Sequence, residues 1–85
     1  MFQIRTMLYL SENIRYLRSK AGKSQRALAE QLGITRARYS KYEYGTAEPP
    51  LEILLKISDY YHVTINVLIA VSIPDRSSVR QHQEE

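Results

Sequence analysis

The sequence lacks cysteine and tryptophan, and it contains only three glycines and three prolines. Without cysteine the chain can form neither disulfide bonds nor thiolate metal sites, which is compatible with a reducing cytoplasm. No apolar run approaches the length of about 18 residues that a membrane-spanning helix requires. The first residues hold one arginine and no small-residue cleavage site, so we expect no secretory signal. These absences predict a soluble, cytoplasmic protein that does not associate with membranes.

The side-chain groupings that identify enzymes are also missing. The two histidines, His62 and His82, are distant in sequence and have no cysteine or carboxylate companions at metal-ligand spacing. We recognise no pair of nucleophile and base, no pair of carboxylates and no glycine-rich phosphate loop. We therefore expect no catalytic residue, no metal, no cofactor and no small-molecule site. The sequence favours a binding protein over an enzyme.

Negative charge is scarce in the first half of the chain. Residues 1–47 hold nine lysines and arginines against three glutamates, a net charge of +6. Residues 48–85 hold three basic against six acidic side chains, a net charge of −3. A positive half indicates a polyanionic partner on one side of the molecule. Ordinary surface charge explains the same numbers equally well, so the motifs must decide between the two interpretations.

Apolar residues recur at helical spacing from residue 10 onward, in a chain long enough for one small domain. A first helix is predicted between Ser11, as its N-cap, and Gly22, as its stop. A second helix begins after Ser24 as N-cap and ends at Gly33, which can take the left-handed conformation that a helix exit requires.

Three further helices follow the same signals. A third helix, residues 36–44, is predicted between Thr35 as N-cap and Gly45 as its end. The fourth begins after Pro50, which offers no side-chain cap, and the fifth begins after Thr64 as N-cap. The pattern therefore predicts an all-α fold.

Both ends of the chain are harder to assign. Phe2, Ile4, Thr6, Leu8 and Leu10 fall on one alternating set of residues 2–10, which indicates an extended arm. Residues 68–73 are short, β-branched and followed by Pro74, so they could pair with the arm as a strand or serve as a linker. Beyond Pro74 the chain is polar, and we expect disorder there. We divide the chain into an N-terminal arm (1–9), a helical domain (10–70) and a C-terminal tail or linker (71–85).

The second and third predicted helices are joined by a short turn that contains glycine, which is the arrangement of a helix-turn-helix unit. Ala29 is small enough for the two helices to approach closely, and Gly33 permits the sharp turn. Ile34 fills the corner, and Tyr39 and Tyr42 face inward from the third helix. The segment TRARYSKYEYG (35–45) then leaves basic side chains on its exposed side.

From Asn13 to Ile69 the sequence resembles the Cro/phage-repressor (XRE-type) helix-turn-helix family. The resemblance rests on Arg18, on Ser-Gln ahead of Leu-Ala in the second helix, on a Glu-x-Gly ending at Gly45, and on a leucine-rich fourth helix. All of these features fall in register over about two-thirds of the chain. The resemblance implies a compact five-helix, lambda-repressor-like domain. It also implies a homodimer that binds double-stranded DNA at a palindromic operator, with half-sites about one helical turn apart.

The resemblance assigns roles to individual residues. The positions that read base edges in the major groove are Arg36, Ala37 and Lys41. The positions that contact phosphates are Ser24, Gln25, Thr35, Arg38, Ser40 and Thr46. The structural pair that joins the first helix to the end of the third is Arg18 and Glu43. Elementary chemistry agrees for two of them: the fork of Arg36 can bond guanine O6 and N7 together, and Arg38 is rotated from Arg36 by about 200°.

Two tyrosines depart from the family pattern. Related repressors usually have isoleucine or valine where this chain has Tyr39, and leucine or isoleucine where it has Tyr42. Since each hydroxyl needs a polar outlet, we expect both side chains to be partly exposed at the edges of the third helix.

The end of the predicted domain is unusually apolar. Asn66 and Val67 replace an acidic pair that is usual in the family. Further apolar side chains follow at Ile69, Ala70, Val71 and Ile73. They form either a dimer contact or the closing layer of a small core, and the sequence does not separate the two.

The leading hypothesis is a sequence-specific DNA-binding transcriptional regulator, acting as a repressor, that reads the major groove with the helix at 36–44. The alternative is an antitoxin or protein-interaction module that binds a partner through its apolar arm and tail, with DNA binding secondary. A steep dependence of DNA affinity on salt would favour the regulator.

Overall fold

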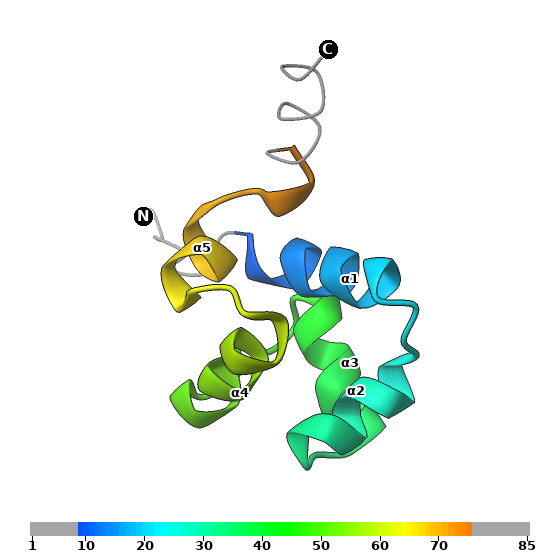
Figure 1. Ribbon diagram of the computed structural model, residues 1–85. Coiled ribbons are helices and arrows are strands. Elements are labelled where there is room, and N and C mark those ends of the chain that lie inside the picture. The colour runs from blue at the N-terminus through cyan, green and yellow to red at the C-terminus, as the bar shows by residue number, and fades with distance from the viewer. Residues whose placement is uncertain (1–8, 76–85) are drawn as a thin grey trace.

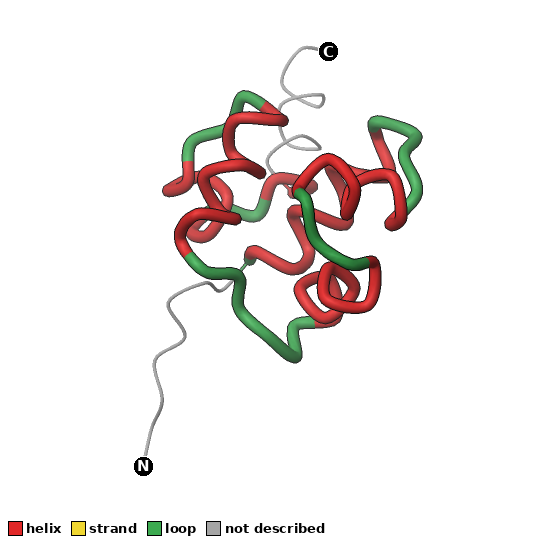
Figure 2. Tube along the Cα trace, turned by 90° about the horizontal axis from the view of Figure 1, so that it is seen from below, coloured by secondary structure: helices red, strands yellow, loops and turns green. Residues whose placement is uncertain are grey.

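Five short helices follow one another in residues 9–75, the part of the chain that the computed structural model describes. They are α1 (Leu10–Lys20), α2 (Gln25–Leu32), α3 (Arg36–Tyr44), α4 (Leu51–Tyr61) and α5 (Ile65–Ala70). Residues 73–75 are helical as well. Residues 9–75 contain no strand, as Figure 2 shows, and no helix among them is long and apolar enough to cross a bilayer. The predicted all-α fold is confirmed.

Helix α1 packs mainly against α3 and α5. In Figure 1, α2 and α3 pack together beneath one side of α1, and α4 and α5 lie on the other side. Every helix contributes side chains to one core. The buried apolar residues are Leu10, Ile14, Leu28, Ala29, Leu32, Tyr39, Tyr42, Ile53, Leu54, Ile57 and Leu68. Because α3 contributes only its two tyrosines to this core, its other side is left to solvent.

Most of the predicted helix boundaries are confirmed by hydrogen bonds. The side chains of Ser24, Thr35 and Thr64 each accept a hydrogen bond from the backbone N–H three residues later. Gly33 and Gly45 end α2 and α3 in the left-handed conformation, at φ values of 74° and 78°. Helix α4 begins after Pro50 without a side-chain cap, as expected.

The predicted start of the first helix is wrong. Ser11 lies inside α1, and the N-cap is Tyr9, whose carbonyl accepts a hydrogen bond from the N–H of Asn13 at 2.9 Å. Leu10 is the first helical residue and is buried in the core. Burial of this apolar side chain therefore outweighs the local preference of serine for the cap position.

The strand alternative for residues 68–73 is also wrong. Leu68 to Ala70 form the end of α5, and Ile73 is helical again. The Asn13 side chain, which is fully buried, donates through Nδ2 to the carbonyls of Leu68 (2.6 Å) and Val71 (2.7 Å). Its Oδ1 accepts from the N–H of Ile73 at 2.9 Å. These bonds hold the segment against α1.

The arm predicted for residues 1–9 lies outside the described residues except for Tyr9. The N–H of Tyr9 donates to the carbonyl of Ile69 at 3.2 Å, so the chain enters α1 beside the end of α5. The predicted end of the domain at residue 70 stays a prediction, although Ile73 still packs against the core.

Candidate nucleic-acid interface

Helices α2 and α3 form the helix-turn-helix unit that the sequence indicates. Ala29 is buried where the two helices approach each other, and its carbonyl accepts a hydrogen bond from the N–H of Ile34 at 3.0 Å. Ile34 packs against the core at the corner. The left-handed Gly33 between them closes the turn. The direction of α3 is therefore fixed by short-range backbone geometry.

One side of α3 is buried and the other faces solvent. The inward residues are Tyr39, Tyr42 and Glu43. The three residues predicted to read bases are Arg36, Ala37 and Lys41, and all of them are exposed. At about 100° per residue, they lie within about 140° of one another on the helix surface. The structure thus brings them together on one face.

Arg38 lies at the edge of that face. Its Nε donates to the hydroxyl of Tyr42 at 2.9 Å, one helical turn further along. This contact holds the guanidinium on the flank of α3, on the opposite side of the helix from Arg36 and about 60° from Lys41. A cation in that position is suited to a phosphate beside the groove and not to a base edge within it.

The carboxylate of Glu43 lies at the centre of a hydrogen-bond network behind α3, and the residue is 1% exposed. Arg18 donates to it twice, from Nε to Oε2 at 2.6 Å and from Nη2 to Oε1 at 3.1 Å. The hydroxyl of Tyr39 donates to Oε2 at 2.6 Å, and Nε2 of Gln25 donates to Oε1 at 3.0 Å. These donors fill the roughly four lone-pair positions of a carboxylate. The network joins α1, α2 and α3.

The network also sets the protonation states of its members. Burial by itself would raise the pKa of Glu43, but the hydrogen bonds from Arg18, Tyr39 and Gln25 outweigh it and lower that pKa below its usual value. The hydrogen bond to Glu43 raises the pKa of Arg18. Burial, together with the hydrogen bond to the carboxylate, raises the pKa of Tyr39. A buried ion pair with neutral donors around it is therefore stable at neutral pH.

Gln25 is oriented by this network. An ionised carboxylate can accept hydrogen bonds but cannot donate them, so the amide nitrogen of Gln25, and not its oxygen, must face Glu43. One Nε2 hydrogen then remains for another acceptor. Gln25 is also the first residue of α2, where unpaired backbone N–H groups make the helix N-terminus favourable for an anion.

The other residues predicted to contact phosphates are small and lie around the same surface. Ser24 and Thr35 accept hydrogen bonds as helix caps, and both are exposed. The hydroxyl of Ser40 donates to the carbonyl of Ala37 at 2.9 Å, and that of Thr46 donates to the carbonyl of Lys41 at 3.4 Å. Their contacts to phosphate stay predictions.

The expectation of partly exposed tyrosines is wrong. Tyr39 and Tyr42 are 1% and 3% exposed. Each hydroxyl finds its partner on α3 itself, four residues away: Tyr39 with Glu43 and Tyr42 with Arg38. The spacing of four residues along the helix thus gives each hydroxyl a hydrogen-bond partner within the protein, and contact with solvent is not needed.

Tyr44 was missed in reading the sequence. It is the last residue of α3 and 67% exposed, the largest exposed fraction among the large hydrophobic side chains in residues 9–75. It follows Ala37 by seven residues and Lys41 by three, which is the spacing of one helix face. That spacing was the available signal.

Comparisons with known proteins agree with this geometry. The helix-turn-helix family model matches residues 14–68. The chain is 43% identical over 58 residues to the SPbeta prophage-derived HTH-type transcriptional regulator YonR of Bacillus subtilis, an alignment that covers 68% of this chain and 54% of the relative. It is 34% identical over 59 residues to the cryptic phage CTXphi transcriptional repressor RstR of Vibrio cholerae, covering 69% and 53%.

Solved structures show the same fold. The P22 c2 repressor, in complex with a synthetic operator, superposes with a TM-score of 0.68 at 30% identity and covers 72% of this chain and 92% of its own. The chain spans about half the length of the curated relatives it matches. The turn between α2 and α3, the exposed face of α3 and these matches lead to one conclusion: the chain belongs to the helix-turn-helix family and shares the fold of phage repressors.

Proposed function

We propose that the chain is a sequence-specific, double-stranded-DNA-binding transcriptional regulator that acts as a repressor in the cytoplasm. The observation that carries this proposal is the two-sided construction of α3. Tyr39, Tyr42 and Glu43 fix its inner side, and Arg36, Ala37 and Lys41 stand exposed on the outer side. Two relatives support it, because one is a prophage-derived transcriptional regulator and the other a phage transcriptional repressor.

The two sets of residues have different tasks. Arg36 lies at the exposed start of α3, where its planar fork suits the O6 and N7 atoms of guanine. Ala37 presents a methyl group, which suits a thymine methyl or close approach of the helix. Gln25 and the N-terminus of α2 suit a phosphate of the same half-site, because they offer donors and no negative charge.

We place the contact of the proposed homodimer on α4 and not on residues 68–73. Residues 68–73 are held against α1 through Asn13, which supports the interpretation that they close the core. In residues 9–75 the exposed large aliphatic side chains are Leu51 and Leu55 of α4, which are 64% and 53% exposed and one helical turn apart. We place the dimer contact there. A two-fold dimer predicts a palindromic operator.

Selection of a binding site from random duplexes, followed by affinity measurement on single-base variants, tests the proposal. We expect Arg36→Ala to weaken binding by about 1–3 kcal/mol on the selected site and to relax the preference at one base pair. Arg38→Ala is the matched control, because it removes an arginine of the same helix that is assigned to a phosphate and not to a base. It should weaken all duplexes alike.

Two outcomes would contradict the proposal. Weak binding that is the same for all duplexes and flat with salt would favour the protein-interaction module instead. Equal losses for Arg36→Ala on the selected site and on unrelated DNA would remove the base-reading role of Arg36.

A further inference from the structure

The exposed face of α3 ends in an aromatic side chain, Tyr44, to which no role has yet been assigned. Two rows of residues run along this face at intervals of three and four. One row holds Arg36, which is exposed, and Ser40, which is half-buried; the other holds Ala37 and Lys41, which are both exposed. Tyr44 is the next position in both rows, because it follows Arg36 by eight residues and Ala37 by seven. An aromatic ring that is 67% exposed therefore lies at the end of the proposed base-reading surface.

The position of Tyr44 along the helix matches the width of the major groove. With a rise of about 1.5 Å per residue, Tyr44 lies about 12 Å beyond Arg36 along the axis of α3. The major groove is about 12 Å wide. When Arg36 reaches a base edge within the groove, Tyr44 therefore stands at a sugar–phosphate wall.

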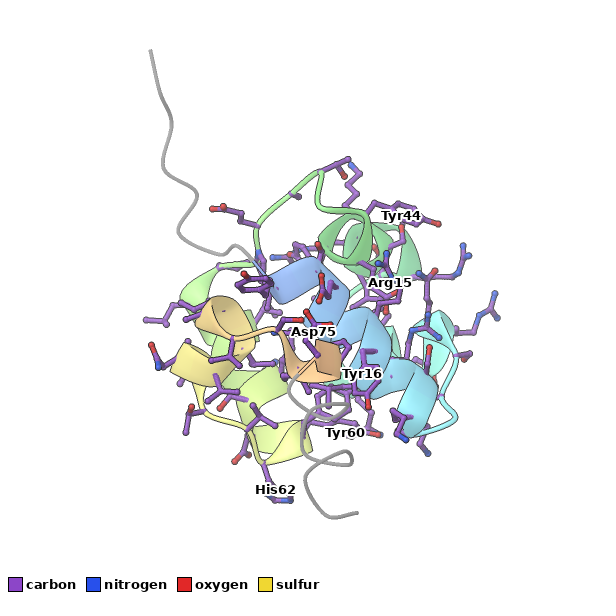
Figure 3. The ribbon with its side chains drawn as sticks, turned by 90° about the horizontal axis from the view of Figure 1, so that it is seen from above. Arg15, Tyr16, Tyr44, Tyr60, His62 and Asp75 are labelled. Carbon is purple, nitrogen blue, oxygen red and sulfur yellow. The ribbon has the colours of Figure 1, made fainter. Side chains whose placement is uncertain are left out.

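A cation accompanies Tyr44 at this end of α3. Arg15 of α1 is exposed, and its Nη1 lies 3.5 Å from the carbonyl oxygen of Glu43, the residue before Tyr44. Figure 3 shows the Arg15 and Tyr44 side chains on the same side of the molecule, with Tyr16 and Tyr60 on the other side of α1. The contact to the carbonyl is long and uses one of five N–H donors, so most of the guanidinium stays available.

We propose that Tyr44 and Arg15 form a second contact to the DNA backbone, which fixes the C-terminal end of α3. The ring of Tyr44 packs on a deoxyribose, and its hydroxyl donates to a phosphate oxygen. Arg15 neutralises the same or the next phosphate. Gln25, at the start of α2, lies beside the same end of α3, because its Nε2 bonds Glu43, so the two contacts together hold this end of α3 against the DNA backbone. This inference rests on the proposed function.

The test measures affinity for the selected duplex and for a scrambled duplex over a range of salt concentrations. We expect Tyr44→Ala to weaken binding to both duplexes about tenfold, and Tyr44→Phe to weaken it about threefold, without changing the preference at any base pair. Arg15→Ala should lower the slope of log affinity against log salt by about one. The tyrosine variants should leave that slope unchanged, because the phenol carries no charge.

The matched control is Tyr16→Ala, which removes an aromatic side chain of α1 that carries Lys20 over its ring, on the other side of the helix. It should leave both affinities unchanged. Unchanged affinity of Tyr44→Ala, or a loss confined to one base pair, overturns the backbone contact. If Arg36→Ala and Gln25→Ala weaken binding in the same experiment, only this inference fails. If they do not, the proposed function fails with it.

Discussion

The most direct test of the network behind α3 compares two buried tyrosine hydroxyls. The hydroxyl of Tyr39 donates to Glu43 at 2.6 Å, whereas the hydroxyl of Tyr61 is buried and has no partner among the described residues. Phenylalanine removes each hydroxyl and preserves the ring. The two substitutions therefore remove the same atom, in one case from a buried hydrogen bond and in the other from a buried site without a hydrogen-bond partner.

The expected magnitudes differ in size and in sign. A hydrogen bond to a charged group contributes about 1.5–3 kcal/mol, so Tyr39→Phe should lower the free energy of unfolding by about 2 kcal/mol. In a domain of this size that corresponds to a fall in Tm of about 8–16 °C. Tyr61→Phe removes a group whose burial is uncompensated, so stability should stay the same or rise by up to about 1 kcal/mol.

Urea and thermal unfolding, followed by circular dichroism, measure both values. Burial raises the pKa of Tyr61 to about 12, and burial with the bond to Glu43 raises that of Tyr39. Neither phenol therefore costs stability by ionising below about pH 10, and the free energy of unfolding falls as the pH rises above that value and the unfolded chain ionises. Equal losses for the two phenylalanine variants, or no loss for Tyr39→Phe, would refute the argument that the partner decides the effect.

Four further predictions concern stability, each measured by urea unfolding. Because hydrogen bonds lower the pKa of Glu43, its anion stabilises the fold above its ordinary value of 4.5, and that stability is lost as the pH falls through the folded pKa. Glu43→Gln should flatten the acid limb of the stability profile, and exposed Glu30→Gln should not. Gly33→Ala should lower the free energy of unfolding by about 1–2 kcal/mol through its positive φ alone, because an added Cβ meets only Lys56 Nζ at 3.8 Å. His62 also has a positive φ, of 57°, which suits glycine better than histidine. His62→Gly should therefore raise the free energy of unfolding by up to about 1 kcal/mol. Asn13→Ala should cost about 3 kcal/mol or more, because it leaves backbone groups of Leu68, Val71 and Ile73 without their buried partner.

The sequence was sufficient for the fold because the helix signals here are local. Ser24, Thr35 and Thr64 cap helices through hydrogen bonds that span three residues, and Gly33 and Gly45 end helices through their own φ values. Nothing distant is needed to predict such features. The prediction of Ser11 as the N-cap of α1 was wrong because the start of this helix is determined by the burial of Leu10, which is a tertiary effect.

The ends of the domain were harder for the same reason. Residues 68–73 are apolar and β-branched, and their local pattern permits a strand. Their conformation is determined instead by Asn13, which is 55 to 60 residues away in sequence and supplies three hydrogen bonds. A single buried amide has no periodic signature, so no pattern in the sequence pointed to it.

The candidate site was predictable where it depends on helical spacing. Arg36, Ala37 and Lys41 share a face because they share a helix, and their exposure follows from the burial of the opposite side. The orientation of Gln25 was not predictable, because it depends on a carboxylate that α3 brings to the start of α2. The resemblance indicated a contact between Arg18 and Glu43, but not the donors from Tyr39 and Gln25 that complete it.

The two tyrosines of α3 show why a residue that is usual in related repressors need not suit this chain. An isoleucine or valine at position 39 would fill part of the same volume, but it would leave Glu43 with three donors in a site that is 1% exposed. The carboxylate would then be free to turn toward Arg18, and the contact that orients Gln25 would weaken. The inner side of α3 is thus held by directional hydrogen bonds as well as by apolar packing. In this chain a change at either Tyr39 or Glu43 therefore disturbs both the core and the residue proposed to meet the phosphate.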